Sequence, residues 1–430
     1  MNPEPKSATE TTLFRNRNYR FLLVADILSS PGYYIYIIAV EWLMLTLYDS
    51  RSYLGLMLFS SSFARLLFTI YGGIIADRLN RKLIILVTQW GEAFIIAAIL
   101  LCYIADVISP VFLIVASFLF GILSAFASPA YESIITSIVE KSSLQRGNAL
   151  LRLANQYSLI IGPLISSTLI VTIGFVGVFS FSLLTILASS LLVSFIQVPD
   201  QQFSEHSTSQ WDDFKASVTH IRKHQVLPIL MVLGFVMNFF VAGPIGVVIP
   251  ILAKDILEGN AFVLGMLEVS LGLGFILGSI TVSIRKPFNR PGLAILYSLL
   301  VMVLAYSALG FVQQLILSMF ALLLVSFFIQ LMNIPLFTYI QTNTEANMVG
   351  KVMSLFISVA SGLTPLSFAM ISYLLHLHID IQLIIRIFGA FLIVITAGTF
   401  LISPLGILHM KTRPREQNSR KKTKECRLKN

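Results

Sequence analysis

Five charged residues lie more than about one helical turn inside long apolar runs of the sequence, where a charge is costly enough to indicate a function. They are Asp26, Glu41, Arg65, Glu92 and Glu268. Arg65 lies about 12 residues from either end of its run, which places it roughly 18 Å from water on both sides if the run is a helix. Its side chain cannot reach water over that distance, so it needs an anionic partner or a wet cavity.

Asp26 and Glu92 occur at a depth similar to that of Arg65, and we expect these three side chains to form a buried cluster. One guanidinium cannot neutralise two carboxylates, so one of the acids should take up and release protons. Such an exchange is the physical requirement for a proton-coupled process. The alternative is a static ion pair that fixes helix packing, with the second acid permanently protonated.

Glu41 and Glu268 are the remaining acids within apolar runs. Glu41 lies 15 residues after Asp26, about 22 Å further along the same helix. At that position it can meet a proton or a cationic or polar group of a substrate, and Glu268 lies at a similar depth in a later run. The alternative for both acids is hydration close to a helix end.

The elements that must position these side chains are apolar runs of about 20 residues, each long enough to cross a bilayer as a helix. The chain is 56% hydrophobic and 12% charged, with a mean hydropathy of +0.83. Soluble domains carry about 25% charged residues, so that class is excluded. We predict an all-α membrane protein with twelve spans, at about residues 20–47, 53–75, 83–104, 110–130, 149–171, 177–198, 227–252, 262–283, 292–312, 316–338, 352–375 and 382–406.

The basic residues indicate how these spans are oriented. Of 30 Lys and Arg residues, 25 fall on the side of the N-terminus, only Arg51 and Lys254 fall on the other, and Arg65, Arg152 and Arg386 lie within spans. Cytoplasmic loops carry such an excess, so both termini are expected in the cytoplasm, in a multi-pass protein of the inner or plasma membrane. The net charge of +9 is explained by this asymmetry, and nucleic acid is not expected as a partner.

The chain divides into two halves of six spans. Gly162-Pro163 in span five has a counterpart in Thr364-Pro365 of span eleven, 202 residues later, which is typical of an internal repeat. Between the halves, apolar residues at helical spacing, from Trp211 to Ile221, predict a helix lying on the inner membrane face; a docking site for a partner is the alternative. The predicted parts are an N-terminal bundle (1–198), a cytoplasmic linker (199–226), a C-terminal bundle (227–408) and a basic tail (409–430) that contacts lipid.

A motif lies between spans two and three. Its residues are Gly73, Asp77, Arg78, Arg81 and Lys82. This pattern resembles the signature loop of the major facilitator superfamily, and it departs from that pattern at Asn80, where glycine is usual. The segments Phe14–Tyr19, Gly162-Pro163 and Gly350-Lys351-Val352 resemble the branch that holds macrolide-efflux proteins and the enterobactin exporter.

The resemblance implies alternating access, in which two six-helix halves rock about a central site. In this family Asp77 would lie against the N-terminal end of span eleven near Lys351, where the helix dipole favours a carboxylate. Gly162 and Pro163 would provide close packing and a kink, as in antiporters. Arg78 and Arg81 are expected to pair with acids at the inner helix ends, such as Glu132 or Glu140. The alternative is that the basic residues of the motif only set the topology.

Motifs of other classes are missing from the sequence. It contains no phosphate-binding Gly-x-x-x-x-Gly-Lys-Ser/Thr loop, no His-Glu-x-x-His and no Gly-x-Ser-x-Gly, which argues against a primary pump, an intramembrane metalloenzyme and a hydrolase. We therefore expect a monomeric secondary transporter without a cofactor, one that exports small amphipathic molecules such as macrolide-like drugs or siderophores in exchange for protons. A facilitator or symporter that imports a nutrient or lipid is the alternative, with an intramembrane enzyme as a more remote one.

Overall fold

The computed structural model describes residues 13–140, 143–198, 215, 218, 219, 221, 222, 224, 226–285, 288, 290–344 and 348–402; of residues 74, 77, 78, 401 and 402 only the backbone is described. Most of the predicted linker helix and the whole basic tail therefore lie outside the described residues. Within the described ranges every regular element is a helix. A helix satisfies its own backbone hydrogen bonds, which is what a segment surrounded by lipid requires.

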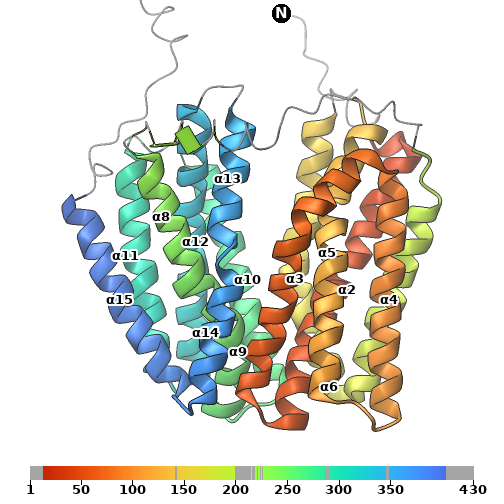
Figure 1. Ribbon diagram of the computed structural model, residues 1–430, viewed down its shortest axis with the longest axis horizontal. Coiled ribbons are helices and arrows are strands. Elements are labelled where there is room, and N and C mark those ends of the chain that lie inside the picture. Colours follow the sequence, from red (N-terminus) through yellow and green to blue (C-terminus); the bar gives the residue numbers. More distant parts are fainter. Residues whose placement is uncertain are drawn as a thin grey trace, which may run out of the picture.

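The first group of helices forms one side of the molecule (Figure 1). Several of them begin at a polar residue that caps free backbone N–H groups. The side chain of Asn16 accepts hydrogen bonds from two backbone N–H groups of the first helix, and Ser50 and Ser109 cap the second and fourth. This group consists of α2 (Arg17–Tyr48), α3 (Arg51–Arg78), α4 (Arg81–Ile104), α5 (Pro110–Ile138) and α6 (Leu144–Ser194).

The helix α6 contains 51 residues, which corresponds to about 77 Å and is far longer than a bilayer of about 30 Å. Its backbone is non-helical at Gly174, with φ 69° and ψ −170°, a conformation essentially restricted to glycine. This break divides α6 into two spans. Eleven helices are long and apolar enough to cross a membrane, and with α6 counted as two the predicted fold of twelve spans is confirmed.

The second group lies on the other side of Figure 1. Its first span is interrupted twice by π-helical turns, η1 and η2, in which hydrogen bonds join residues five apart. The group consists of α8 (Leu227–Met237), η1 (Asn238–Ala242), α9 (Gly243–Ile251), η2 (Leu252–Ile256), α10 (Ala261–Ile284), α11 (Pro291–Leu309), α12 (Leu315–Asn343), α13 (Val349–Ser361), α14 (Thr364–His376) and α15 (Ile381–Ile402).

The two groups meet toward one face of the molecule. We call the face where α2 begins and α15 ends the terminal face, and the opposite one, where α2 ends and α3 begins, the far face. In Figure 1 the groups approach each other toward the far face. There Gly55 of α3 packs directly on Ser372 of α14, and Gly265 of α10 on Ser167 of α6. Small residues allow this close approach of helix backbones.

Candidate functional site

A cavity of about 400 Å³ lies within the second group, between α8, η1, α9, α10, α11, α12 and α13. This volume is within the range of small-molecule sites in proteins. The residues that line it are Gly234, Met237, Asn238, Val241, Ala242, Ile245, Leu271, Phe275, Met302, Ile329, Met332, Asn333, Leu336, Phe337, Phe356, Ile357, Ala360 and Ser361.

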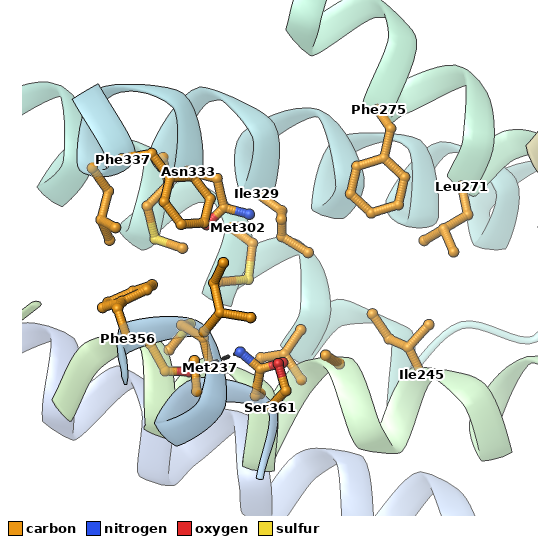
Figure 2. A pocket seen from close by; sticks show the side chains of 18 residues that line it. Met237, Ile245, Leu271, Phe275, Met302, Ile329, Asn333, Phe337, Phe356 and Ser361 are labelled. Carbon is orange, nitrogen blue, oxygen red and sulfur yellow. Dashed lines mark hydrogen bonds between the residues drawn. The ribbon is translucent and has the colours of Figure 1, made fainter. Parts of the chain in front are cut away.

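The lining of this cavity is apolar and adaptable. Three methionines and three phenylalanines contribute most of its bulk, and thioether side chains re-pack readily around ligands of different shape. Its polar side chains are Asn238, Asn333 and Ser361. Figure 2 shows Asn333 and Phe337 on one wall, facing Phe356 and Ser361 on the other. The cavity therefore suits an apolar body that carries a few uncharged hydrogen-bonding groups.

The π-helical segment η1 forms one wall of the cavity. The carbonyl of Asn238 accepts from the backbone N–H of Gly243, and its side-chain Nδ2 donates to the carbonyl of Gly234 at 3.0 Å. On the other side of η1, Ser367 Oγ donates to the carbonyl of Phe239 at 2.6 Å. Neither η1 nor the cavity was predicted from the sequence. The glycines and prolines at Gly243-Pro244, Gly246 and Pro250 within one span do indicate an irregular helix.

Ion pairs between the two groups close the far face. Arg51 Nε lies 2.5 Å from Asp255 Oδ2, and Lys254 Nζ lies 2.5 Å from Asp49 Oδ1. Lys254 Nζ also donates to the carbonyl of Leu45 at 2.6 Å. These contacts join the α2–α3 turn to η2. We refer to Asp49, Arg51, Lys254 and Asp255 as the far-face latch.

The far-face latch is not expected to respond to pH between 5 and 8. The hydrogen bond from Lys254 lowers the pKa of Asp49 below its ordinary value of 3.8. A lowered carboxyl pKa means that the contact is fully present above the ordinary value and is lost only as the pH falls below it. We expect Asp49→Asn to shift the opening equilibrium of the far face by the same amount at pH 5.5 and at pH 7.5. The shift is measured as the labelling rate of a cysteine that the closed far face shields from the external solution. A pH-dependent shift would contradict this assignment.

Two of the membrane-embedded acids lie within electrostatic range of each other across the boundary between the groups. Glu41 of α2 is 6% exposed, and its carboxylate lies within electrostatic range of Glu268 of α10. No hydrogen bond or ion pair is found for either carboxylate among the described residues. On α10, Glu268 precedes the cavity residues Leu271 and Phe275 by about one and two turns, so all three lie on one side of the helix, with Glu268 nearest the far face.

The expected cluster of Arg65 with Asp26 and Glu92 is not formed. Asp26 is buried and accepts hydrogen bonds from Ser30 Oγ at 2.9 Å and Asn155 Nδ2 at 3.4 Å. The Arg65 side chain is exposed, and no ion pair joins it to either acid in the described part of the chain. The depths of the three residues agree, but α3 packs mainly against α5 and α14 rather than against the helices that carry the acids.

Two basic residues of the signature motif, Arg81 and Lys82, contact their own half of the protein. Arg81 Nη1 donates to the Ser133 carbonyl at 3.0 Å and to Ser137 Oγ at 2.7 Å, so the expected pairing of Arg81 with Glu132 or Glu140 is not seen. Lys82 Nζ donates to the carbonyl of Ser194 at 2.6 Å. Both side chains thus tie the start of α4 to the ends of α5 and α6.

The other motif residues are placed as follows. Asp77 and Arg78 form the last turn of α3, and their side chains lie outside the described residues. A Cβ at Gly73 would meet nothing within 4 Å, whereas at Gly162 it would approach the Cβ of Tyr34 on α2.

The two remaining positions lie on different helices. Pro163 lies inside α6, and its carbonyl would meet a Cβ added at Gly265 of α10 at 3.2 Å. Lys351 lies in the first turn of α13. Among the described residues, no cluster of three His, Cys, Asp or Glu is arranged to hold a metal ion.

Comparison with solved structures supports the fold. The nucleoside transporter NupG superposes with a TM-score of 0.71 over 89% of this chain and 98% of that structure, at 11% sequence identity. At this level of identity the likeness concerns the fold alone. The arrangement of the two helix groups is therefore the one found in that structure.

The sequence relationships are closer. Macrolide efflux protein A of Streptococcus pyogenes is 22% identical over 68% of this chain and 73% of its own length. Enterobactin exporter EntS of Escherichia coli O1:K1 / APEC is 27% identical over 66% of this chain and 67% of its own length. Both relatives are transporters rather than enzymes. The family model described as transmembrane secretion effector matches residues 8–415. The chain therefore belongs to the transmembrane secretion effector family of the major facilitator superfamily.

Proposed function

We propose that this transporter exports small amphipathic molecules from the cytoplasm in exchange for protons. The observation that carries the proposal is the 400 Å³ cavity with its methionine and phenylalanine lining. The efflux activities named for two relatives support the direction of transport. The uncharged lining favours substrates whose bound part is apolar, because burying an unpaired charge there would be costly.

The terminal face is the cytoplasmic face in this proposal. The 25-to-2 distribution of Lys and Arg favours that orientation. The contacts at the far face then exclude the external side, and the described conformation corresponds to the one that loads substrate from the cytoplasm. Rocking of the two groups would break the far-face latch and release the substrate outside.

Protons enter the proposal through the membrane-embedded acids. Glu41 and Glu268 lie close together without a cation among the described residues. Bringing both carboxylates together in a low-dielectric environment requires a proton on at least one of them. Proton uptake from outside therefore favours closing of the far face, and proton release to the cytoplasm favours its opening, which is the order that antiport needs.

The proposed function is tested with a substitution whose larger side chain fills the cavity. Ala242 lines it, and Ala242→Trp should place an indole in the space that the substrate needs. We expect efflux of erythromycin, ethidium and enterobactin by an overexpressing strain to fall at least about tenfold, since binding would lose more than about 1.4 kcal/mol. The matched control is Ala390→Trp, at an exposed alanine of α15 outside the cavity, which should transport normally. A wild-type protein that moves none of these compounds, or an Ala242→Trp protein that moves them unimpaired, would contradict the proposed function.

A further inference from the structure

A hydrogen-bonded network lies inside the first group, away from the cavity. Its centre is Gln89 of α4, which is 2% exposed. Gln89 Nε2 donates to Tyr131 Oη of α5 at 2.6 Å and to Ser189 Oγ of α6 at 2.8 Å. Gln89 Oε1 is buried and has no hydrogen-bond partner within the described ranges. An unsatisfied buried acceptor of this kind calls for a water or a proton donor.

The hydrogen bond from Gln89 leaves the hydroxyl proton of Tyr131 available for another acceptor. A tyrosine hydroxyl carries one proton and two acceptor positions. Because Tyr131 Oη already accepts from Gln89, its own proton points to another group. The side chains near the Tyr131 hydroxyl are those of Ser29 and Ser189. The acids within electrostatic range of it are Asp26 and Glu92. Glu92 follows Gln89 by three residues, so it lies on the same side of α4 as the unsatisfied Oε1.

The chain of titratable groups continues toward the far face. Tyr33 of α2 is within electrostatic range of both Glu92 and Glu41, and Glu41 in turn of Glu268. Arg65 also lies within electrostatic range of Tyr33. On α2, Asp26, Tyr33 and Glu41 follow one another at intervals of about 11–12 Å along the helix axis.

The second group contrasts with this arrangement. The cavity of the second group is lined by residues without an ionisable side chain. Glu268 is the member of the proposed acid series that lies in the second group. Substrate space and titratable groups thus occupy different halves of the described molecule. Glu268 lies on α10 one turn toward the far face from the cavity residue Leu271.

We propose that protons pass from Glu268 of the second group into the first group and cross it along a route that does not run through the substrate cavity, and that Gln89 positions the central relay of this route, Tyr131. The inference rests on the proposed function, since it assigns the path of the exchanged protons. The groups of the route, from the far face inward, are Glu268, Glu41, Tyr33, Glu92, Tyr131 and Asp26.

In the proposed transfer, Tyr131 loses one proton and gains one. Tyr131 gives its hydroxyl proton to the carboxylate of Asp26 while it receives a proton from the carboxyl group of Glu92, so the phenol ends as it began. Where two groups are beyond hydrogen-bond distance, a bridging water carries the proton between them. Asp26, held by Ser30 and Asn155, then releases the proton toward the terminal face.

The experiment separates proton coupling from substrate movement. Wild-type protein, Tyr131→Phe and Gln89→Leu are reconstituted in liposomes with an acidic interior, and uptake of radiolabelled erythromycin is compared with counterflow at equal pH. We expect both variants to lose pH-driven accumulation by a factor of about ten or more, with counterflow unchanged. The matched controls lie in the second group: Tyr306→Phe, whose buried Oη has no partner in the described part of the chain, and Gln330→Leu, which loses a similar hydrogen bond to Ser279.

Each outcome bears on a distinct claim. If wild-type protein accumulates erythromycin and both variants accumulate it equally well, the route is wrong and the proposed function stands. If the control variants lose coupling to the same extent, or if Tyr131→Phe also loses counterflow, Tyr131 supports general packing or substrate movement and the route is again overturned. If wild-type protein shows no pH-driven accumulation, the proposed function itself fails, and the route with it.

Discussion

Glu268→Gln and Glu41→Gln are expected to abolish accumulation of substrate against its gradient while leaving downhill exchange intact. In the described conformation the two carboxylates are close together without a cation among the described residues, so closing of the far face requires a proton. Glutamine has nearly the same shape and is always neutral, and closing would then no longer depend on a proton. A pH gradient of one unit supplies about 1.4 kcal/mol per proton, which corresponds to about tenfold accumulation for each coupled proton.

Accumulation ratios in liposomes with imposed pH gradients measure this effect directly. The wild-type ratio should rise about tenfold per pH unit for each coupled proton, whereas the ratio of either glutamine variant should stay near one at every gradient. Glu258→Gln is the matched control, because Glu258 is an exposed acid at the far face. If the accumulation ratio of a glutamine variant still rises with the pH gradient, the coupling role would have to be assigned to Asp26 or Glu92 instead.

Gly55→Trp is expected to hold the far face open. A Cβ added at Gly55 would lie 2.8 Å from Ser372 Cβ and 3.0 Å from its Cα, so a larger side chain cannot be accommodated without separating α3 from α14. The hydrogen bond from Ser372 Oγ to the carbonyl of Ser52, at 2.7 Å, would be lost as well. Because the backbone on both sides is helical, the separation must be taken up by rocking of the two groups.

Labelling of a buried position reports this opening. Ser167 is completely buried where α6 meets Gly265 of α10, so Ser167→Cys in a background without Cys102 and Cys426 should resist a membrane-impermeant maleimide. Adding Gly55→Trp should raise its labelling rate at least about tenfold, which corresponds to a shift of about 1.4 kcal/mol in the opening equilibrium. Gly398→Trp, where a Cβ meets nothing within 4 Å, should leave the rate unchanged. Equal rates in all three proteins would show that this contact does not govern opening.

The helices and their number were predictable because lipid leaves the chain few alternatives. Apolar runs of the right length must be helices that satisfy their own backbone, and the predicted boundaries agree well with α2, α4 and α10. The two spans that α6 carries were also separated correctly, since residues 172–176 interrupt two long runs at Gly174. These features depend on local sequence.

The candidate site was less predictable because it depends on which side of each helix faces which neighbour. Depth along the membrane follows from residue numbers, so Arg65, Asp26 and Glu92 were assigned to one level, but their partners depend on packing. The pairing of Glu41 with Glu268 joins residues 227 positions apart, and no local pattern indicates it. The cavity arises from five or more helices at once, and its methionines and phenylalanines are indistinguishable in sequence from ordinary core or lipid-facing residues.

The two π-helical turns in the span from α8 to η2 also limit how this protein can be aligned with its relatives. Each turn holds one residue more than an α-helix of the same height needs, and one residue rotates everything beyond it by about 100°. Lys254 contacts Leu45 and Asp49 from within the second of these turns, so the extra residue of the first turn precedes it. A relative that lacks that extra residue would keep the same membrane thickness yet need its latch cation at a neighbouring position. A one-residue gap in this span therefore marks a change of helix register, which a gap in a surface loop would not.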